Sequence, residues 1–209
     1  MKKNNRLRKK SKINATKIII ITGSIGMGKS TTLSLFRHLG YPYFDADFSA
    51  RKVVESDTNG YKMVKENFPS VIKDNKIDRK ALGKIVFSNA NALRKLEKII
   101  HPLIKKERER FIKSHRVKRS KAIVLDIPLF LEKKEESSHL NIFVVTAPSF
   151  IQRQRVIRRK GMTNDRFINI LNSQMPDIIK RQKSTQIIQS GLGKRFVLNK
   201  IKFLKRKIR

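Results

Sequence analysis

The sequence predicts an α/β domain built on a parallel sheet, and two observations lead to this fold class. Runs of β-branched and other apolar residues, typical of strands buried on both faces, alternate with stretches of helical periodicity. The first run, at 17–21, leads through a glycine-rich turn into a helix-like segment that ends at Gly40. The chain has 209 residues, enough for one such domain with inserted segments and a sizeable core.

The glycine-rich turn has the sequence Gly23-Ser24-Ile25-Gly26-Met27-Gly28-Lys29-Ser30, which fits the phosphate-binding pattern G-x-x-x-x-G-K-[ST]. Glycines let backbone N–H groups turn toward phosphate oxygens, and the following helix presents its positive end to the same anion. Lys29 is expected to reach the β- and γ-phosphates, Ser30 to offer its hydroxyl to Mg²⁺, and Thr31 to add a phosphate contact. The flanking strand and helix favour a nucleoside-triphosphate enzyme or switch over a plain glycine turn.

A second strand is predicted at 41–44, followed by Asp45-Ala46-Asp47. Ligands gather at the carboxyl ends of strands in an open parallel sheet, so two carboxylates at this point suit catalysis. One can accept a proton from an attacking hydroxyl, and the other can orient the water ligands of Mg²⁺ or cap a helix starting at Phe48. A pair of capping residues is the structural alternative. Arg51 lies one helical turn after Asp47, where it can bind a substrate phosphate or pair with a carboxylate.

The segment from Asp57 to His115 has helical periodicity throughout and no strand signal, which predicts a helical insertion between strands. Asp78 is expected to cap one of its helices. The apolar stripes of these helices are formed by Val64 and Phe68, by Leu82, Ile85 and Val86, and by Leu93, Leu96, Ile100 and Leu103. His101, taken alone, is typical of a core or capping histidine.

Three further strands are predicted at 122–126, 141–145 and 186–188. The first of them ends in Asp126, an arrangement suited to contact with Mg²⁺ through water. Between the other two lies a basic run from Gln152 to Gly161. Such a run is usually a solvated helix, and in a phosphate-transfer enzyme it can be a lid whose arginines close over the transferred group.

Two more helices are predicted toward the end of the chain. Thr163 is expected to cap a helix whose one side carries Phe167, Ile170, Leu171 and Gln174, and Pro176 restarts the chain after it. A final amphipathic helix packed on the sheet is predicted from the spacing of Val197, Ile201, Leu204 and Ile208.

The formal net charge is +34, because 50 Lys and Arg residues stand against 16 Asp and Glu residues. This excess attracts anions, so nonspecific affinity for nucleic acid is expected. Aromatic residues make up only 7% and no base-reading motif is present, which favours compositional bias over a dedicated nucleic-acid surface. Residues 1–16 are predicted to be a disordered basic tail, with an arm for nucleic acid or anionic lipid as the alternative.

The composition also limits which kinds of site the protein can contain and where in the cell we expect it. Cysteine is absent, which excludes disulfides, thiolate metal sites and cysteine nucleophiles. No apolar run approaches the roughly 20 residues that span a bilayer. We expect a cytoplasmic protein without a membrane partner, and the sequence leaves its oligomeric state open.

Taken together, the motifs resemble those of the dephospho-CoA kinase family. They match in family order and comprise Thr22–Ser30, Asp45–Asp47 with Ala50-Arg51, Ile77–Arg79 with Leu82-Gly83, Leu96-Glu97 leading to His101–Ile104, Asp126–Leu129 with Glu132, Gln152–Thr163 and Gln174–Asp177. The resemblance implies a P-loop NTPase fold of three α/β/α layers, with a parallel five-stranded sheet, a helical CoA-binding insertion and a helical lid. It also implies ATP-dependent phosphorylation of the ribose 3′-hydroxyl of dephospho-CoA, giving CoA and ADP in the final step of CoA biosynthesis.

The resemblance assigns roles to individual residues. Asp47 is implied as the carboxylate that takes the hydroxyl proton, while Lys29 and Arg155 stabilise charge on the phosphates. The implied ATP site comprises Gly26, Met27, Gly28, Lys29, Ser30, Thr31, Arg155 and Arg159. The implied acceptor site comprises Asp45, Asp47, Arg51 and His101. Mg²⁺ is assigned to Ser30 and, through water, to Asp126.

The expected organisation is a tail at 1–16 and a kinase domain at 17–209. The domain comprises core segments at 17–56, 120–150 and 184–209, a substrate-binding insertion at 57–116 and a lid region at 151–176. The sequence departs from the family at Thr185 and Gln189, near the implied adenine site, where relatives usually carry acidic residues. Two alternatives stay open: a kinase for another nucleotide or nucleoside, and a nucleic-acid-binding protein whose loop serves an ATPase.

Overall fold

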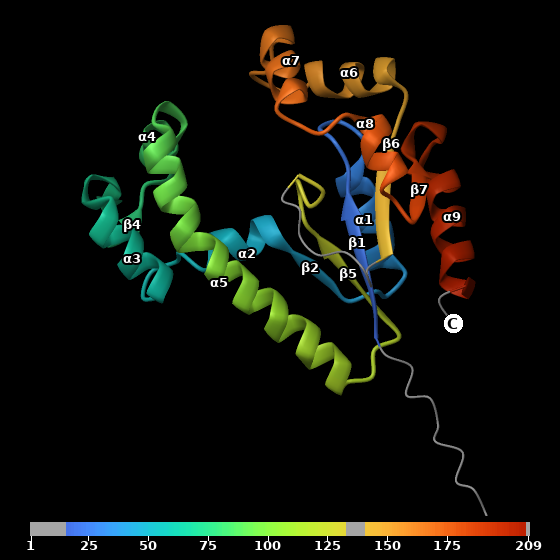
Figure 1. The fold of residues 1–209 in the computed structure, drawn as a ribbon, viewed down its shortest axis with the longest axis horizontal. Coiled ribbons are helices and arrows are strands. Elements are labelled where there is room, and N and C mark those ends of the chain that lie inside the picture. Colours follow the sequence, from blue (N-terminus) through green and yellow to red (C-terminus); the bar gives the residue numbers. More distant parts are fainter. Residues whose placement is uncertain (1–15, 133–140, 208–209) are drawn as a thin grey trace, which may run out of the picture.

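The buried apolar runs form a five-stranded parallel sheet in the computed structural model, which describes residues 16–132 and 141–207. Its strands are β1 (Lys17–Thr22), β2 (Tyr43–Asp45), β5 (Ala122–Asp126), β6 (Asn141–Thr146) and β7 (Gln186–Gln189). Their order across the sheet is β2-β5-β1-β6-β7, and every neighbouring pair is parallel (Figure 1). The predicted α/β class and all five predicted strands are confirmed.

Helices cover both faces of the sheet because successive side chains of each strand point to opposite faces. Ile19 and Ile21 of β1 pack in one cluster with α1 (Lys29–His38) and α9 (Lys194–Lys207). Ile20 packs in a second cluster, on the face that faces α5 (Ala90–Val117). The final helix is confirmed as amphipathic, since Val197, Ile201 and Leu204 are buried. Ile208 lies outside the described residues.

The chain between β2 and β5 forms a lobe with a small core of its own, built from Val64, Phe68, Val71, Leu82, Val86 and Ile99. Its helices are α2 (Ala46–Lys52), α3 (Asn59–Asn67), α4 (Arg79–Ser88) and α5, with the 3₁₀ turn η1 at Pro69–Val71. Asp78 caps α4 as predicted, by accepting from the backbone N–H groups of Lys80 and Ala81. Figure 1 shows α3 and α4 standing apart from the sheet, joined to it through α2 and α5.

Two details of this lobe correct the sequence-based prediction. The segment is not helical throughout, because β3 (Ile72–Lys73) and β4 (Lys76–Ile77) pair as an antiparallel hairpin. The turn uses Asp74 and Asn75 in the left-handed region, at φ 46° and 56°, a conformation that short polar side chains tolerate. The helix expected to start at Phe48 starts at Ala46 instead.

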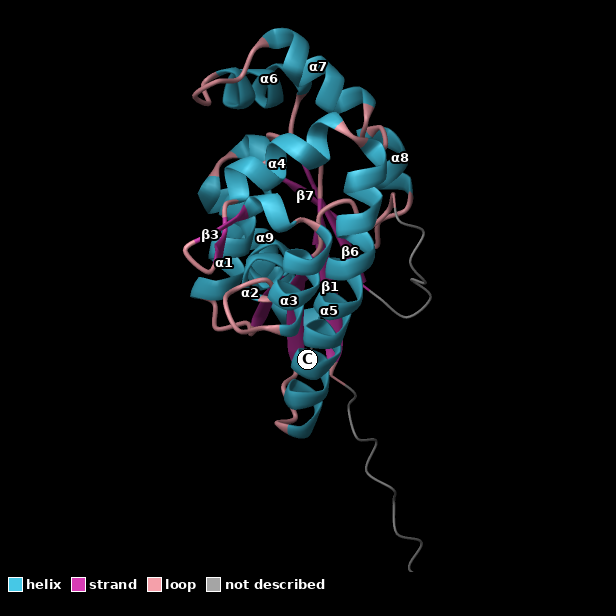
Figure 2. Ribbon diagram, turned by 90° about the vertical axis from the view of Figure 1, so that its left-hand side faces the viewer, coloured by secondary structure: helices cyan, strands magenta, loops and turns pink. Residues whose placement is uncertain are grey.

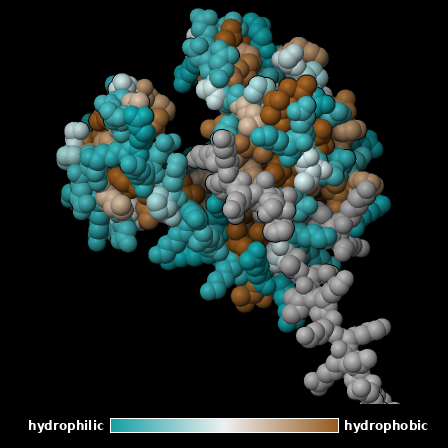
Figure 3. All heavy atoms as spheres, in the orientation of Figure 1, coloured by the Kyte–Doolittle hydropathy of each residue, from teal (hydrophilic) through white to brown (hydrophobic). Residues whose placement is uncertain are grey.

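The last part of the chain places more helices at the carboxyl end of the sheet. They are α6 (Ser149–Ile157), α7 (Asn164–Asn172) and α8 (Asp177–Gln182), followed after β7 by the 3₁₀ turn η2 (Ser190–Leu192). Thr163 caps α7 as predicted, and Pro176 precedes α8. Figure 2 shows α6 and α7 together at one end of the molecule, and the space-filling view shows the surface hollowed between this body and the α3–α4 lobe (Figure 3).

Two further expectations concern the basic tail and membrane-spanning segments. Of the predicted tail, only Thr16 lies within the described residues, and it is buried at the start of β1 rather than disordered. None of the described helices combines the length and the apolar character needed to cross a membrane.

Candidate active site

The loop between β1 and α1 is shaped by glycines and covered by the last part of the chain. Gly26 and Gly28 have φ values of 76° and 88°, in a backbone region that residues with a Cβ rarely adopt. A Cβ on Gly26 would lie 2.5 Å from Cγ2 of Val156, and one on Gly28 would lie 2.6 Å from Oγ of Ser190. The loop therefore needs glycine for its backbone shape and also for the close approach of α6 and η2.

Lys29 is held at the carboxyl end of β5. Its Nζ lies 2.5 Å from Oδ1 of Asp126, a residue 97 positions away that strand pairing brings beside β1. Burial raises the pKa of the Asp126 carboxyl, and the charges of Asp45 and Asp47 raise it further, against the opposing effect of the Lys29 ammonium. The ammonium and three carboxylates thus share one edge of the sheet.

Asp45 and Asp47 take up different positions at this edge. Asp45 caps α2, because its carboxylate accepts a hydrogen bond from the N–H of Phe48 at 2.8 Å. Asp47 lies in the first turn of α2 with an exposed side chain that lines a large cleft. Capping, left open by the sequence, thus accounts for one carboxylate and leaves the other facing the cleft.

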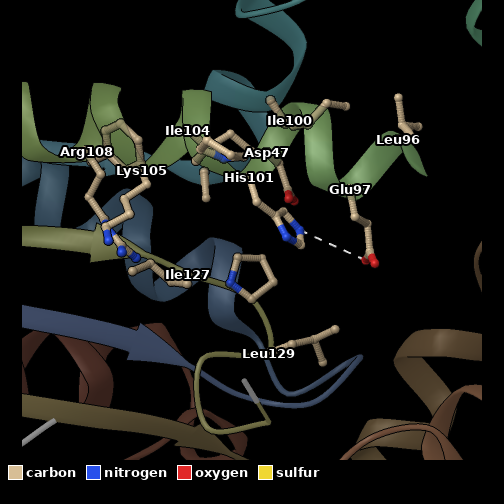
Figure 4. Close-up of a pocket in the computed structure, with 15 residues that line it drawn as sticks. Asp47, Leu96, Glu97, Ile100, His101, Ile104, Lys105, Arg108, Ile127 and Leu129 are labelled. Carbon is tan, nitrogen blue, oxygen red and sulfur yellow. Dashed lines mark ion pairs between the residues drawn. The ribbon is translucent and has the colours of Figure 1, made fainter. Parts of the chain in front are cut away.

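The cleft has a volume of about 1010 Å³ and lies between α2, α5 and the loop that follows β5. Figure 4 shows Asp47 and His101 facing the same space from these two helices. The Nε2 atom of His101 lies 4.0 Å from Oε1 of Glu97, one turn earlier on α5. Of the four residues implied for the acceptor site, Asp47 and His101 line the cleft. Arg51 is exposed on α2 and Asp45 caps that helix, so neither belongs to the cleft lining.

Arg155 on α6 is fixed against the phosphate loop. Its Nη1 donates to Oγ of Ser190 at 2.9 Å and its Nη2 to the carbonyl of Ser190 at 3.1 Å. The Ser190 hydroxyl in turn donates to the carbonyl of Met27 at 2.6 Å. Arg159 lies just beyond the end of α6 and is exposed. The structure therefore brings Arg155, but not Arg159, into contact with the predicted phosphate loop.

Two glutamines that sequence reasoning gave no individual role hold the phosphate loop at Ile25. Gln152 donates from Nε2 to the carbonyl of Ile25 at 2.7 Å, and Oε1 of Gln174 accepts from the N–H of Ile25 at 3.1 Å. The sequence predicts Gln174 on one side of the helix that Thr163 caps, but α7 ends at Asn172, so Gln174 lies beyond the helix.

A buried ion pair near the same edge also escaped prediction. The side chain of Lys180 is fully buried, and its Nζ lies 2.8 Å from Oε1 of Glu132. The same oxygen accepts from the N–H of Met175 at 3.1 Å. These contacts join the start of α8 to the loop after β5, and one lysine among so many gives no sequence signal of burial.

The remaining predicted residues lie around the loop and β7. Ser30 and Thr31 are exposed in the first turn of α1. Thr185 donates from its hydroxyl to the carbonyl of Ile142 at 3.0 Å, and Gln189 ends β7 with an exposed side chain. Within the described ranges, no group of three or more His, Cys, Asp or Glu side chains is placed to hold a metal ion.

Comparison with known sequences gives a consistent result. A model of the family described as dephospho-CoA kinase matches residues 17–193. The chain is 44% identical over 165 residues to a dephospho-CoA kinase of Paramagnetospirillum magneticum, and the aligned region covers 79% of this chain and 78% of the relative. It is 39% identical over 176 residues to the dephospho-CoA kinase of Mesorhizobium japonicum, covering 84% and 88% of the two chains.

Solved structures show the same likeness. The structure called TT1252 from Thermus thermophilus superposes with a TM-score of 0.77 at 30% identity, covering 93% of this chain and 99% of that one. A dephospho-CoA kinase from Campylobacter jejuni superposes with a TM-score of 0.67 at 26% identity, covering 92% and 97%.

Proposed function

Because the chain belongs to the dephospho-CoA kinase family, which phosphorylates dephospho-CoA with ATP in the final step of CoA biosynthesis, we propose that the transfer takes place where the phosphate loop meets the α2–α5 cleft. ATP is the phosphate donor and the ribose 3′-hydroxyl of dephospho-CoA is the acceptor. The observation that carries the proposal is the position of Asp47, which faces the cleft beside the Lys29–Asp126 pair.

The donor side is formed by the loop and the helix that covers it. Backbone N–H groups of the loop and the start of α1 bind the phosphates of ATP. When ATP binds, Lys29 exchanges its contact with Asp126 for one with the β- and γ-phosphates. The positive charge of its ammonium then lies beside the transferred group instead of beside the Asp126 carboxylate. Arg155, which already contacts the loop through Ser190 and Gly26, neutralises the same charge. Met27, Ser30, Thr31 and Arg159 complete the proposed ATP site.

The acceptor side is the cleft. Asp47 accepts the proton of the 3′-hydroxyl as the hydroxyl oxygen bonds to the γ-phosphorus and the bond to the departing ADP oxygen breaks. His101 faces Asp47 across the cleft and positions the ribose. Asp45 holds the helix that carries Asp47. Arg51, in the last turn of the same helix but outside the cleft lining, is the remaining proposed contact of the acceptor. Residues 57–116 act as the substrate-binding insertion and residues 151–176 as the lid region.

Mg²⁺ is part of the proposal because the donor set fits its chemistry. This ion keeps several water ligands and takes one or two protein groups together with substrate phosphates, so it does not need a cluster of three carboxylates. Ser30 follows Lys29 in the first turn of α1, and Asp126 ends β5 at the same edge of the sheet. The Ser30 hydroxyl and, through water, Asp126 would hold the ion, which would supply positive charge to the phosphates of ATP.

The variant Asp47→Asn tests the assignment of the base. The amide keeps the shape of the carboxylate and cannot take the proton, so we expect ATP affinity to persist while transfer to dephospho-CoA falls by about 10²- to 10⁴-fold. Equilibrium binding of ATP and steady-state turnover measure the two effects separately. Turnover close to that of the unsubstituted chain would show that another group accepts the proton.

A further inference from the structure

The cleft beside α5 is uneven in charge along its length. Lys105 and Arg108 line one part of it, and Asp47, Glu97 and His101 line the rest. Figure 4 shows the nitrogen-bearing ends of Lys105 and Arg108 close together near Ile127, on the opposite side of His101 from Glu97. Positive charge gathered in one part of a cleft favours an anionic group of the ligand there.

The helix sets how far these cations lie from the reacting centre. His101, Lys105 and Arg108 follow the spacing i, i+4, i+7, which places them along one face of α5. At about 1.5 Å of rise per residue, Lys105 and Arg108 start about 6 Å and about 10 Å farther along the helix than His101. The cations are thus one to two turns from the residue that faces Asp47.

The acceptor carries an anion that matches this distance. In dephospho-CoA the diphosphate is attached through C5′ to the same ribose whose 3′-hydroxyl reacts, so the diphosphate must lie a few bonds from Asp47 when the hydroxyl does. The adenine is attached to another side of the ribose and carries no charge. The cationic part of the cleft therefore suits the diphosphate, and the part near Leu96 and Glu97 is left for the base.

We propose that Lys105 and Arg108 form the subsite that holds the 5′-diphosphate of the acceptor, and this inference rests on the proposed function of the cleft. Arg108 is partly buried in the cleft wall, where its guanidinium offers a planar set of donors suited to phosphate oxygens. Lys105 is more exposed and supplies a second positive charge. The pair fixes which way the acceptor lies and selects nucleosides that carry a 5′-diphosphate.

Steady-state kinetics of the full chain with dephospho-CoA and ATP tests the subsite. Lys105→Ala and Arg108→Ala are each expected to raise the KM for dephospho-CoA about ten- to a hundredfold, with kcat and the KM for ATP within about threefold of the unsubstituted values. Lys105→Arg is expected to restore most of the affinity. The matched control is Lys106→Ala, which removes the same charge from the same helix at a residue outside the cleft lining.

A second measurement follows how the KM for dephospho-CoA depends on salt concentration. A loss of folding would not change this dependence in the same way. The KM for dephospho-CoA is expected to rise with NaCl concentration, and to rise less steeply in the Lys105→Ala/Arg108→Ala double variant than in Lys106→Ala. Changes in KM no larger than those of Lys106→Ala, or an equal rise in the KM for ATP, would overturn the subsite. If the unsubstituted chain does not phosphorylate dephospho-CoA, the proposed function fails instead, so the two failures are distinct.

Discussion

Asp45 and Asp47 stand two positions apart, and the start of a helix gives them different chemistry. The capping position turns the Asp45 carboxylate back onto the N–H of Phe48, whereas the first helical turn points Asp47 outward along the cleft. The sequence predicted one proton acceptor and one capping or metal-orienting residue. The cap is observed, and the role of Asp47 as the base stays a prediction.

The carboxyl of Asp126 gives the stability of the protein a predictable pH dependence. Burial raises its pKa above the unfolded value of about 3.9, with Asp45 and Asp47 adding to the shift and Lys29 opposing it. A group with a raised folded pKa contributes stability that is fully present below the unfolded value and is lost as pH rises through the folded value.

We therefore expect the Tm of the unsubstituted chain, relative to that of Asp126→Asn, to be highest below the unfolded pKa of about 4 and to decline as the pH rises above it through the folded pKa. Thermal denaturation followed by circular dichroism over this range measures the difference. A difference independent of pH would mean that Asp126 titrates alike in the folded and unfolded chains.

At the scale of elements, the helices at the carboxyl end of the sheet act on the phosphate loop through Ile25. Gln174→Ala removes the acceptor of the Ile25 N–H. Losing one such hydrogen bond costs about 1 kcal/mol, so we expect the KM for ATP to rise about fivefold while the KM for dephospho-CoA changes little. Gln154→Ala, an exposed glutamine on α6, is the control. Equal KM values for ATP in the two variants would show that the Gln174 contact does not shape the ATP site.

The packing of α1 against the sheet is tested by Phe36. Its ring is fully buried and contacts Tyr41 and Phe143, with ring centroids 5.2 Å and 6.3 Å away. Phe36→Ala is expected to lower the free energy of unfolding by about 3–5 kcal/mol. Phe87→Ala, at a side chain that is 87% exposed, should change it by less than about 0.5 kcal/mol. Urea denaturation compares the two, and similar losses would contradict the assignment of the core.

The elements differ in how far the sequence predicts them, for physical reasons. The three central strands β5, β1 and β6 are buried on both faces, so their runs of apolar residues are visible without any periodicity, whereas the edge strands β2 and β7 are shorter and only partly buried. The β3–β4 hairpin has two residues per strand, too few for an alternating pattern, and depends on the left-handed conformations of Asp74 and Asn75. A pattern of apolar residues predicts a strand only when the strand is long enough to show the pattern, and two residues are too few.

The candidate site was predictable where it is local in the chain. The phosphate loop follows from its spacing of glycines, and the Asp126 carboxylate follows from its place at the end of a strand. The hydrogen bonds of Gln152 and Gln174 to Ile25 join segments more than a hundred residues apart, with |i−j| of 127 and 149. Lys180 is one of 50 basic residues, so its burial against Glu132 had no distinguishing pattern.

At the scale of the whole molecule, the cleft lies where two parts of the fold meet. The sheet, with α6 over the loop, presents the proposed donor residues, and α2 and α5 present the proposed acceptor residues (Figures 1 and 3). Both substrates are polyanions, so the formal charge of +34 attracts them over a range that salt shortens. The same field attracts nucleic acid without base recognition, which is why affinity for nucleic acid alone does not indicate function.

The measurement that tests the central claim most directly is ADP release by the purified chain with Mg²⁺ and ATP, with and without dephospho-CoA, with the product identified by mass. We expect release that requires dephospho-CoA and yields CoA in equal amount, with nucleoside monophosphates inactive as acceptors. Folded protein that binds ATP but transfers phosphate to a nucleoside monophosphate instead, or hydrolyses ATP only when nucleic acid is added, would contradict it.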